Sequence, residues 1–117
     1  VLKAFEIIKP LGGYYGVIKL LSHEDMNRLN DYTKSIIITG KLPTDVLSFP
    51  KIELPNDFIR KTFHKVYLLI KKKNKKEFIE LLHLFEDFND TSPTTTDRKF
   101  STYKKDEYDK KLKEISY

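Results

Sequence analysis

The feature that most limits how this chain can fold is a pair of apolar seams separated by a lysine-rich stretch. In "PNDF", Asn56 or Asp57 is a candidate helix cap at the start of the first seam. Its apolar residues then recur at helical spacing: Ile59, Phe63, Val66 and Ile70. Beyond the lysines the second seam contains Phe78, Leu81, Leu82, Phe85 and Phe88. The two seams predict a helical hairpin over about residues 57–88.

A single unbroken helix over the same residues is the alternative. It would carry Asn74 as a polar position within the seam and would be about 48 Å long, at a rise of 1.5 Å per residue. In the hairpin, Asn74 lies in the turn and can cap the second helix, with Glu77 at its third position. The hairpin is favoured because it buries both apolar faces within one domain.

The first forty residues show two further patterns. Apolar runs on either side of Pro10-Leu11-Gly12-Gly13 indicate a turn between two strands or two short helices, which leaves an irregular or β-hairpin N-terminus. Ser22 then marks a helix start, with Asp25 in place for a capping-box variant. Apolar residues follow at helical spacing and Gly40 ends the pattern. A strand over residues 34–39 is the alternative, because three isoleucines stand in a row.

The two remaining segments are expected to bind a partner. Residues 41–55 contain three prolines and predict an extended surface loop, with Phe49 and Ile52 among its contacts. Residues 91–117 are expected to be a polar linker and an amphipathic C-terminal arm outside a compact domain of residues 1–90. The arm would offer a partner four side chains: Tyr103, Tyr108, Leu112 and Ile115.

Composition places the chain among small folded proteins and limits its location. Of its 117 residues, 39% are hydrophobic, which is enough for a core in one domain that is mainly α. Cysteine is absent, and the longest apolar run, Val66 to Ile70, is far too short to cross a bilayer. "VLKAFEIIKP" is too short and too charged for a signal peptide. Val1 fits loss of an initiator methionine, trimming of a targeting segment or a boundary chosen within a longer chain. An intracellular protein is expected.

The lysine stretch gives the chain its second functional hypothesis. The net charge is +5, yet acidic residues are mixed among the basic ones throughout. Phosphate contact needs only clustered positive charge, whereas reading bases also needs aromatic or arginine side chains, and none stands between Ile70 and Phe78. Non-specific binding of RNA or DNA would use Lys71, Lys72, Lys73, Lys75 and Lys76.

Catalytic and metal chemistry find little support. No nucleotide-binding glycine loop, nucleophile elbow or zinc motif occurs. His64 and His83 would face each other across the hairpin, with Asp87 one turn beyond, which is a conceivable ligand set for zinc or iron. Packing residues with polar tips are the more common role for such histidines, so no metal, cofactor or catalysis is expected. The favoured function is a non-catalytic accessory or structural subunit that binds other proteins in a larger assembly. The alternative is a small basic nucleic-acid-binding module.

Overall fold

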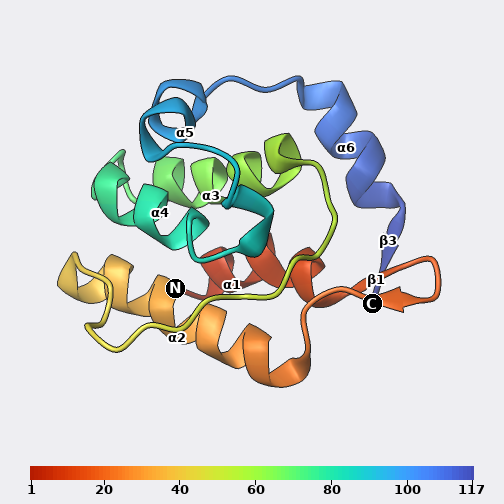
Figure 1. The fold of residues 1–117 in the computed structure, drawn as a ribbon, viewed down its shortest axis with the longest axis horizontal. Coiled ribbons are helices and arrows are strands. Elements are labelled where there is room, and N and C mark those ends of the chain that lie inside the picture. Colours follow the sequence, from red (N-terminus) through yellow and green to blue (C-terminus); the bar gives the residue numbers. More distant parts are fainter.

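The computed structural model describes all of residues 1–117 and is mainly helical (Figure 1). The α-helices are α1 (Leu2–Ile8), α2 (His23–Thr39), α3 (Asn56–Leu69), α4 (Lys75–Leu82), α5 (Pro93–Lys99) and α6 (Lys105–Lys113). Two 3₁₀ turns, η1 (Lys9–Gly12) and η2 (Glu86–Phe88), and three short strands, β1 (Tyr14–Tyr15), β2 (Ile18–Lys19) and β3 (Ile115–Ser116), complete the fold. The predicted fold class, a small domain that is mainly α, is confirmed.

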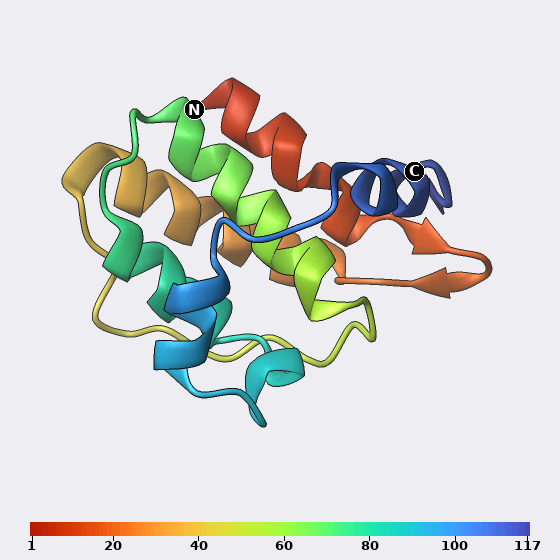
Figure 2. The ribbon, with the colours of Figure 1, turned by 90° about the horizontal axis from the view of Figure 1, so that it is seen from above.

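Helix α3 lies at the centre of the molecule. It packs against α1, α4 and α6, and Figure 2 shows it running between α1 and α4. The predicted seam residues Ile59, Phe63 and Val66 are fully buried, as are Phe78, Leu81 and Leu82 of α4. Burial of these side chains on both sides of one helix supplies the main stabilising term of the fold.

The helical hairpin is confirmed, and the unbroken helix is excluded. The chain reverses between Leu69 and Lys75, where Lys71, Lys72 and Asn74 adopt left-handed backbone conformations that no α-helix tolerates. The cap differs from the prediction. Asn74 makes no capping bond but donates from Nδ2 to the Ile36 carbonyl at 3.4 Å. Glu77 accepts from the backbone N–H of Leu42 at 2.8 Å, so both side chains tie the hairpin to α2 and its following loop.

Helix α2 begins and ends where the sequence indicated. The Ser22 hydroxyl accepts from the Asp25 N–H at 3.1 Å, and Gly40 follows the last helical residue. The helix continues through Thr39, so the strand alternative for residues 34–39 is wrong. Asp25 does not complete a capping box, because its carboxylate binds Arg28 at 2.8 Å instead.

The N-terminus combines the two expected alternatives. Its first apolar run is the helix α1, and the second run forms a β-hairpin by itself, with Tyr15 opposite Ile18. The two turn residues are Gly16 and Val17. Gly16 has a positive φ of 67° and Val17 does not have a positive φ, which is the pattern of a type II′ turn. The hairpin projects from the body of the molecule (Figures 1 and 2).

The C-terminal segment differs most from expectation, because it docks on the domain instead of extending from it. Strand β3 pairs with β1, with Tyr15 opposite Ile115, and completes the sheet order β2-β1-β3. Tyr108 stacks on Phe58 of α3 with ring centroids 4.6 Å apart. A Cβ on Gly13 would lie 2.5 Å from the Ser116 carbonyl oxygen, so the segment approaches the N-terminal turn closely. The expected linker contains α5, which Ser92 caps by accepting from the Thr95 N–H at 3.1 Å.

The longest helix of the structure is α2, and none of the helices combines the length and the apolar character that crossing a membrane requires.

Candidate functional site

Four of the six side chains expected to contact a partner are buried inside this chain. They are Phe49, Ile52, Tyr108 and Ile115, while Tyr103 and Leu112 are half-buried. An enclosed side chain cannot reach a partner unless the domain opens, so the structure corrects the expected contact role of those four. Two sets of contacts explain their burial.

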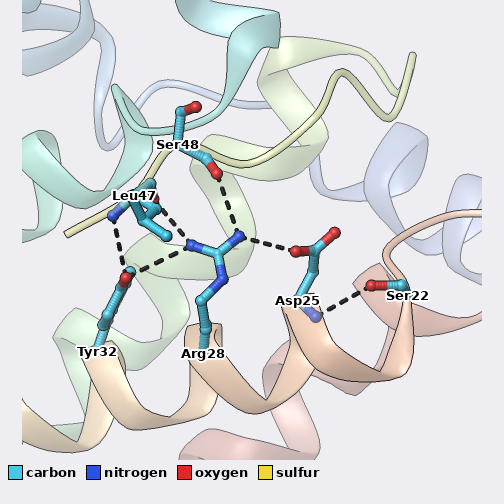
Figure 3. A network of polar contacts seen from close by, with 6 residues as sticks. All are labelled: Ser22, Asp25, Arg28, Tyr32, Leu47 and Ser48. Atoms are coloured by element: carbon cyan, nitrogen blue, oxygen red, sulfur yellow. Dashed lines mark hydrogen bonds and ion pairs between the residues drawn. The ribbon is translucent and has the colours of Figure 1, made fainter.

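The first set holds the proline-containing loop against α2 through Arg28 (Figure 3). The Arg28 guanidinium donates to the carbonyls of Leu47 and Ser48 at 3.0 and 3.1 Å and binds Asp25 at 2.8 Å. It also lies 4.4 Å from the ring centroid of Phe49. Burial lowers the pKa of Arg28, but the hydrogen bonds to Asp25 and Tyr32 outweigh it, so that the pKa is raised overall. These contacts of Arg28 hold the loop against the core, so the loop has a structural role.

The second set fixes the far end of the loop. Phe49 exchanges backbone hydrogen bonds with Leu84 and Glu86, at 2.7 and 3.0 Å. The Asp87 carboxylate accepts from the backbone N–H groups of Ile52 and Glu53 at 3.0 and 2.9 Å. Asp87 therefore orders this loop, and it does not lie beside the two histidines as a third ligand.

The histidines themselves occupy separate environments. His83 shares a 2.7 Å hydrogen bond with Thr96, which anchors α5, and burial lowers its pKa. His64 is buried beside Phe100 and Tyr103, and burial followed by the charges of Lys72, Lys61 and Lys75 lowers its pKa. The structure brings no three histidines or carboxylates together in a group that could hold a metal ion.

The lysine stretch lies at the turn between α3 and α4. Lys71, Lys72, Lys73 and Lys76 are exposed there, and Lys75 pairs with Asp97 of α5 at 2.6 Å. Lys72 and Lys75 also act on His64, so part of the stretch shares a side of the molecule with Lys61. Arg60 does not join them, because it is buried and pairs with Asp57.

A basic–aromatic cluster forms where α3 meets the C-terminal segment; it comprises Lys61, His64, Lys65, Tyr103 and Tyr108. The Lys61 Nζ lies 3.8 Å from the ring centroid of Tyr103, and the Lys65 Nζ lies 4.9 Å from that of Tyr108. Burial, followed by the charge of Lys65, lowers the pKa of Lys61. Tyr103, Tyr108 and Phe58 also line a neighbouring cavity of about 290 Å³, whose other lining residues are mostly charged. Such a combination can hold an anion beside an apolar surface.

The hairpin tip, which we define as Tyr14, Tyr15, Val17 and Ile18, has the opposite character. All four side chains are exposed, Val17 to 95% and Ile18 to 63%. Single exposed apolar side chains are ordinary, and Leu2, Ile38 and Leu47 are examples in this chain. Four neighbouring ones at the end of a projecting hairpin are the kind of patch that marks a contact surface. The outer edge of β2 is also free to pair, because the sheet order places β2 at one end.

One of the four tip residues, Tyr15, ties the hairpin to the C-terminal segment. The Tyr15 hydroxyl accepts from Lys111 Nζ at 2.8 Å and donates to Glu114 at 3.0 Å. These bonds raise the pKa of Lys111, with the Tyr15 bond the larger cause, and lower the pKa of Glu114, with the Lys111 bond the larger cause. The tip is therefore presented on a fixed support.

The comparisons with known proteins give no further guide, since neither protein-family models nor curated proteins nor solved structures match the chain.

The sequence did not predict the hairpin tip as a surface, and it indicated His64, Tyr103 and Tyr108 of the basic–aromatic cluster only in other roles. Part of each surface nevertheless left a signal. Lys61 and Lys65 stand at positions i and i+4 of the predicted helix, which places two cations on one face. "YYGVIK" combines a central glycine with aromatic and β-branched neighbours, a pattern typical of a tight hairpin. Neither pattern reveals which side chains the folded C-terminal segment will cover.

Proposed function

We propose that this chain is a non-catalytic module that binds another protein through its hairpin tip. The observation that carries the proposal is the exposure of Val17 and Ile18 at the end of a projecting hairpin. Each buried apolar side chain of this size contributes roughly 1.5–3 kcal/mol relative to an exposed one, so covering the tip would be a substantial source of affinity.

The support of the hairpin favours tight binding. Because β3 and the Tyr15 contacts fix its base, little conformational entropy is lost when the tip is covered. The tip can also accept a strand, since the backbone of β2 is unpaired along its outer edge.

The partner's chemistry follows from what surrounds the tip. Lys19 lies in β2 with its Nζ 4.9 Å from the ring centroid of Tyr14, and the chain carries a net charge of +5. A complementary surface therefore presents an extended segment in which apolar side chains alternate with acidic ones. The hairpin would add this segment to its sheet.

The test compares two isoleucines of nearly equal exposure. Ile18 in the hairpin is 63% exposed and Ile38 in α2 is 62% exposed, so Ile38→Asp is a matched control for Ile18→Asp. The tagged chain and both variants are used for native affinity capture from the cells that produce the protein, and captured proteins are purified and titrated back. Ile18→Asp should weaken association at least about tenfold, and Ile38→Asp should leave it unchanged.

Equal association of the wild type and the Ile18→Asp variant would contradict the proposal. Circular dichroism melting of both variants controls for misfolding.

A second candidate function is non-specific nucleic-acid binding through Lys71, Lys72, Lys73, Lys75 and Lys76. It is supported by the exposure of four of these side chains on one turn. Anisotropy titrations with mixed-sequence RNA and DNA at several salt concentrations test it. Replacing Lys71, Lys73 and Lys76 by glutamine should weaken binding and reduce its salt dependence by about two to three contacts. If the glutamine variant binds RNA and DNA as tightly as the wild type does, the lysine stretch is not a nucleic-acid-binding site.

A further inference from the structure

Lys61 carries a charge that the protein leaves without a counter-ion. The residue is only 4% exposed, yet it forms no ion pair and no side-chain hydrogen bond. Its Nζ instead lies against two aromatic rings, 3.8 Å from the centroid of Tyr103 and 4.8 Å from that of Tyr108. Solvent still reaches the Nζ atom, so the ammonium group is partly desolvated and not enclosed. A partly desolvated ammonium group that forms no ion pair can take up an anion from solvent.

Two more nitrogen-bearing side chains of α3 lie on the same face. Residues 61, 64 and 65 stand at positions i, i+3 and i+4 of the helix. Lys65 forms no ion pair and lies 4.9 Å from the Tyr108 centroid. The Nδ1 of His64 is buried without a hydrogen-bond partner, and its ring centroid is 5.5 Å from that of Tyr103. Each of the three side chains therefore packs against Tyr103 or Tyr108, and neither lysine Nζ nor the histidine Nδ1 has a polar partner within the protein.

The charges around this place favour an anion with two negative charges. Besides Lys61 itself, the cations that act on Lys61 or His64 are Lys65, Lys72, Lys75 and Lys105. The carboxylates that oppose them are Asp106, Asp109 and Asp97, the last paired with Lys75. The cations therefore outnumber the carboxylates here, and the neighbouring cavity adds equal numbers of lysines and carboxylates. A phosphate monoester carries about −1.5 to −2 at neutral pH.

The ring of Tyr103 covers the Lys61 Nζ atom and can also contact a ligand bound beside it. It belongs to the connection between α5 and α6, outside every helix and strand, so its ring can turn aside without disturbing a helix. The same ring lines the cavity of about 290 Å³ together with Phe58 and Tyr108. An aromatic ring beside an anion site is the arrangement that proteins use to hold a base next to its phosphate.

We propose that Lys61, His64 and Lys65 bind the phosphate group of a nucleotide and that Tyr103 packs against its base. The ligand is a phosphate monoester that carries a flat ring, either as a free nucleotide or at the 5′ end of a single strand. This site goes beyond the protein-binding role of the hairpin tip and uses different residues.

Isothermal titration calorimetry of the full chain with uridine 5′-monophosphate tests the site. The wild type should bind, and Lys61→Met should bind at least about tenfold more weakly, because it removes the charged donor while keeping the aliphatic chain. Lys61→Arg should retain most of the affinity. Lys34→Met, at an exposed position of α2, is the matched control and should bind like the wild type.

Folding does not confound this comparison. Lys61→Met keeps the packed aliphatic part of the side chain and removes only a partly desolvated charge, so its melting temperature should lie close to that of the wild type. A Lys65→Met variant gives a second, independent reduction in affinity should Lys61→Met misfold.

Further ligands separate the two sources of the phosphate. Uridine without phosphate should not bind. A single-stranded oligonucleotide that binds more tightly than the mononucleotide, and only when 5′-phosphorylated, would identify a strand end; equal affinities would identify a free nucleotide.

The triple glutamine variant of Lys71, Lys73 and Lys76 should leave mononucleotide binding unchanged, which separates this site from the turn. A wild type that binds no mononucleotide at about 10 mM, or a Lys61→Met variant that binds like the wild type, would overturn the proposal.

Discussion

The N-terminal hairpin and the C-terminal segment belong to one sheet, yet the hairpin exposes its apolar side chains to solvent and the C-terminal segment buries its own in the core. The hairpin exposes Val17 and Ile18, whereas residues 100–117 bury Phe100, Tyr108 and Ile115. Both segments contain several tyrosines, and β1 pairs with β2 on one side and with β3 on the other. What distinguishes them is position relative to α3, which the C-terminal segment covers and the hairpin does not (Figure 2). Apolar composition alone therefore does not separate a core segment from a contact surface.

The largest expected effect comes from removing the C-terminal segment. A chain that ends at Lys99 loses three buried side chains, and each deletion of that size typically costs about 2–5 kcal/mol. This sum is comparable to the whole stability of a small domain, so the truncated chain should be unfolded or should melt at least about ten degrees lower. Thermal denaturation followed by circular dichroism measures it. An unchanged melting temperature would return the segment to the role of a free arm.

A pair of tyrosine variants sharpens the same contrast within the full chain. Tyr108→Ala removes the ring that stacks on Phe58 and should cost about 3 kcal/mol. Tyr14→Ala, in the exposed hairpin, should cost under about 1 kcal/mol. Urea unfolding of both variants gives the two values, and equal losses would erase the distinction between the segments.

Acidification should weaken the side of the domain where α5 and the C-terminal segment pack. The pKa values of His64 and His83 are lowered by burial below the ordinary value of 6.5. The unfolded chain therefore takes up protons near pH 6.5 that the folded chain does not, so stability should fall as the pH drops below that value. Replacing both histidines by glutamine should flatten this decline. Urea midpoints between about pH 7.5 and 5.5, above the range in which most carboxylates titrate, measure it.

The smallest expected effect is that of Ile18→Asp on stability. Because the side chain is exposed and no core residue depends on it, the free energy of unfolding should change by no more than about 0.5 kcal/mol. Chemical denaturation next to the wild type measures it. A loss of several kcal/mol would show that the tip packs on the domain and would withdraw it as a docking surface.

The sequence predicted the elements whose cause is local. Apolar spacing at 59–70 and at 78–82 indicated α3 and α4, and Ser22 with Gly40 marked the two ends of α2. The second seam was expected to continue to Phe88, but α4 ends at Leu82, and Phe85 and Phe88 are buried beyond its end. The C-terminal segment failed because its fold depends on distant partners. Tyr108 needs Phe58, and Ile115 needs Tyr15, about a hundred residues earlier. The helix α5 did leave a local signal, a serine before a proline at Ser92-Pro93, in the segment expected to be a linker.

The candidate site was predicted only in part. Tyr103, Lys72 and Lys75 were singled out, but in two separate roles, as partner contact and as phosphate contacts. The structure brings them towards His64 and Lys61 on one side of α3. Lys61 left only a weak sequence signal, as a cation one turn before Lys65, because its aromatic neighbours Tyr103 and Tyr108 reach it only when the C-terminal segment folds over α3.

The exposed hairpin tip as a protein-binding surface is most directly tested by site-specific photo-crosslinking. A photoreactive amino acid replaces Val17 in one full-length chain and Ile38 in another, and each is irradiated in the cells that produce the protein. We expect a discrete crosslinked protein from position 17 that is absent from position 38 and is lost when Ile18→Asp is added. Identical crosslinking patterns from the two positions, or none from position 17, would contradict it.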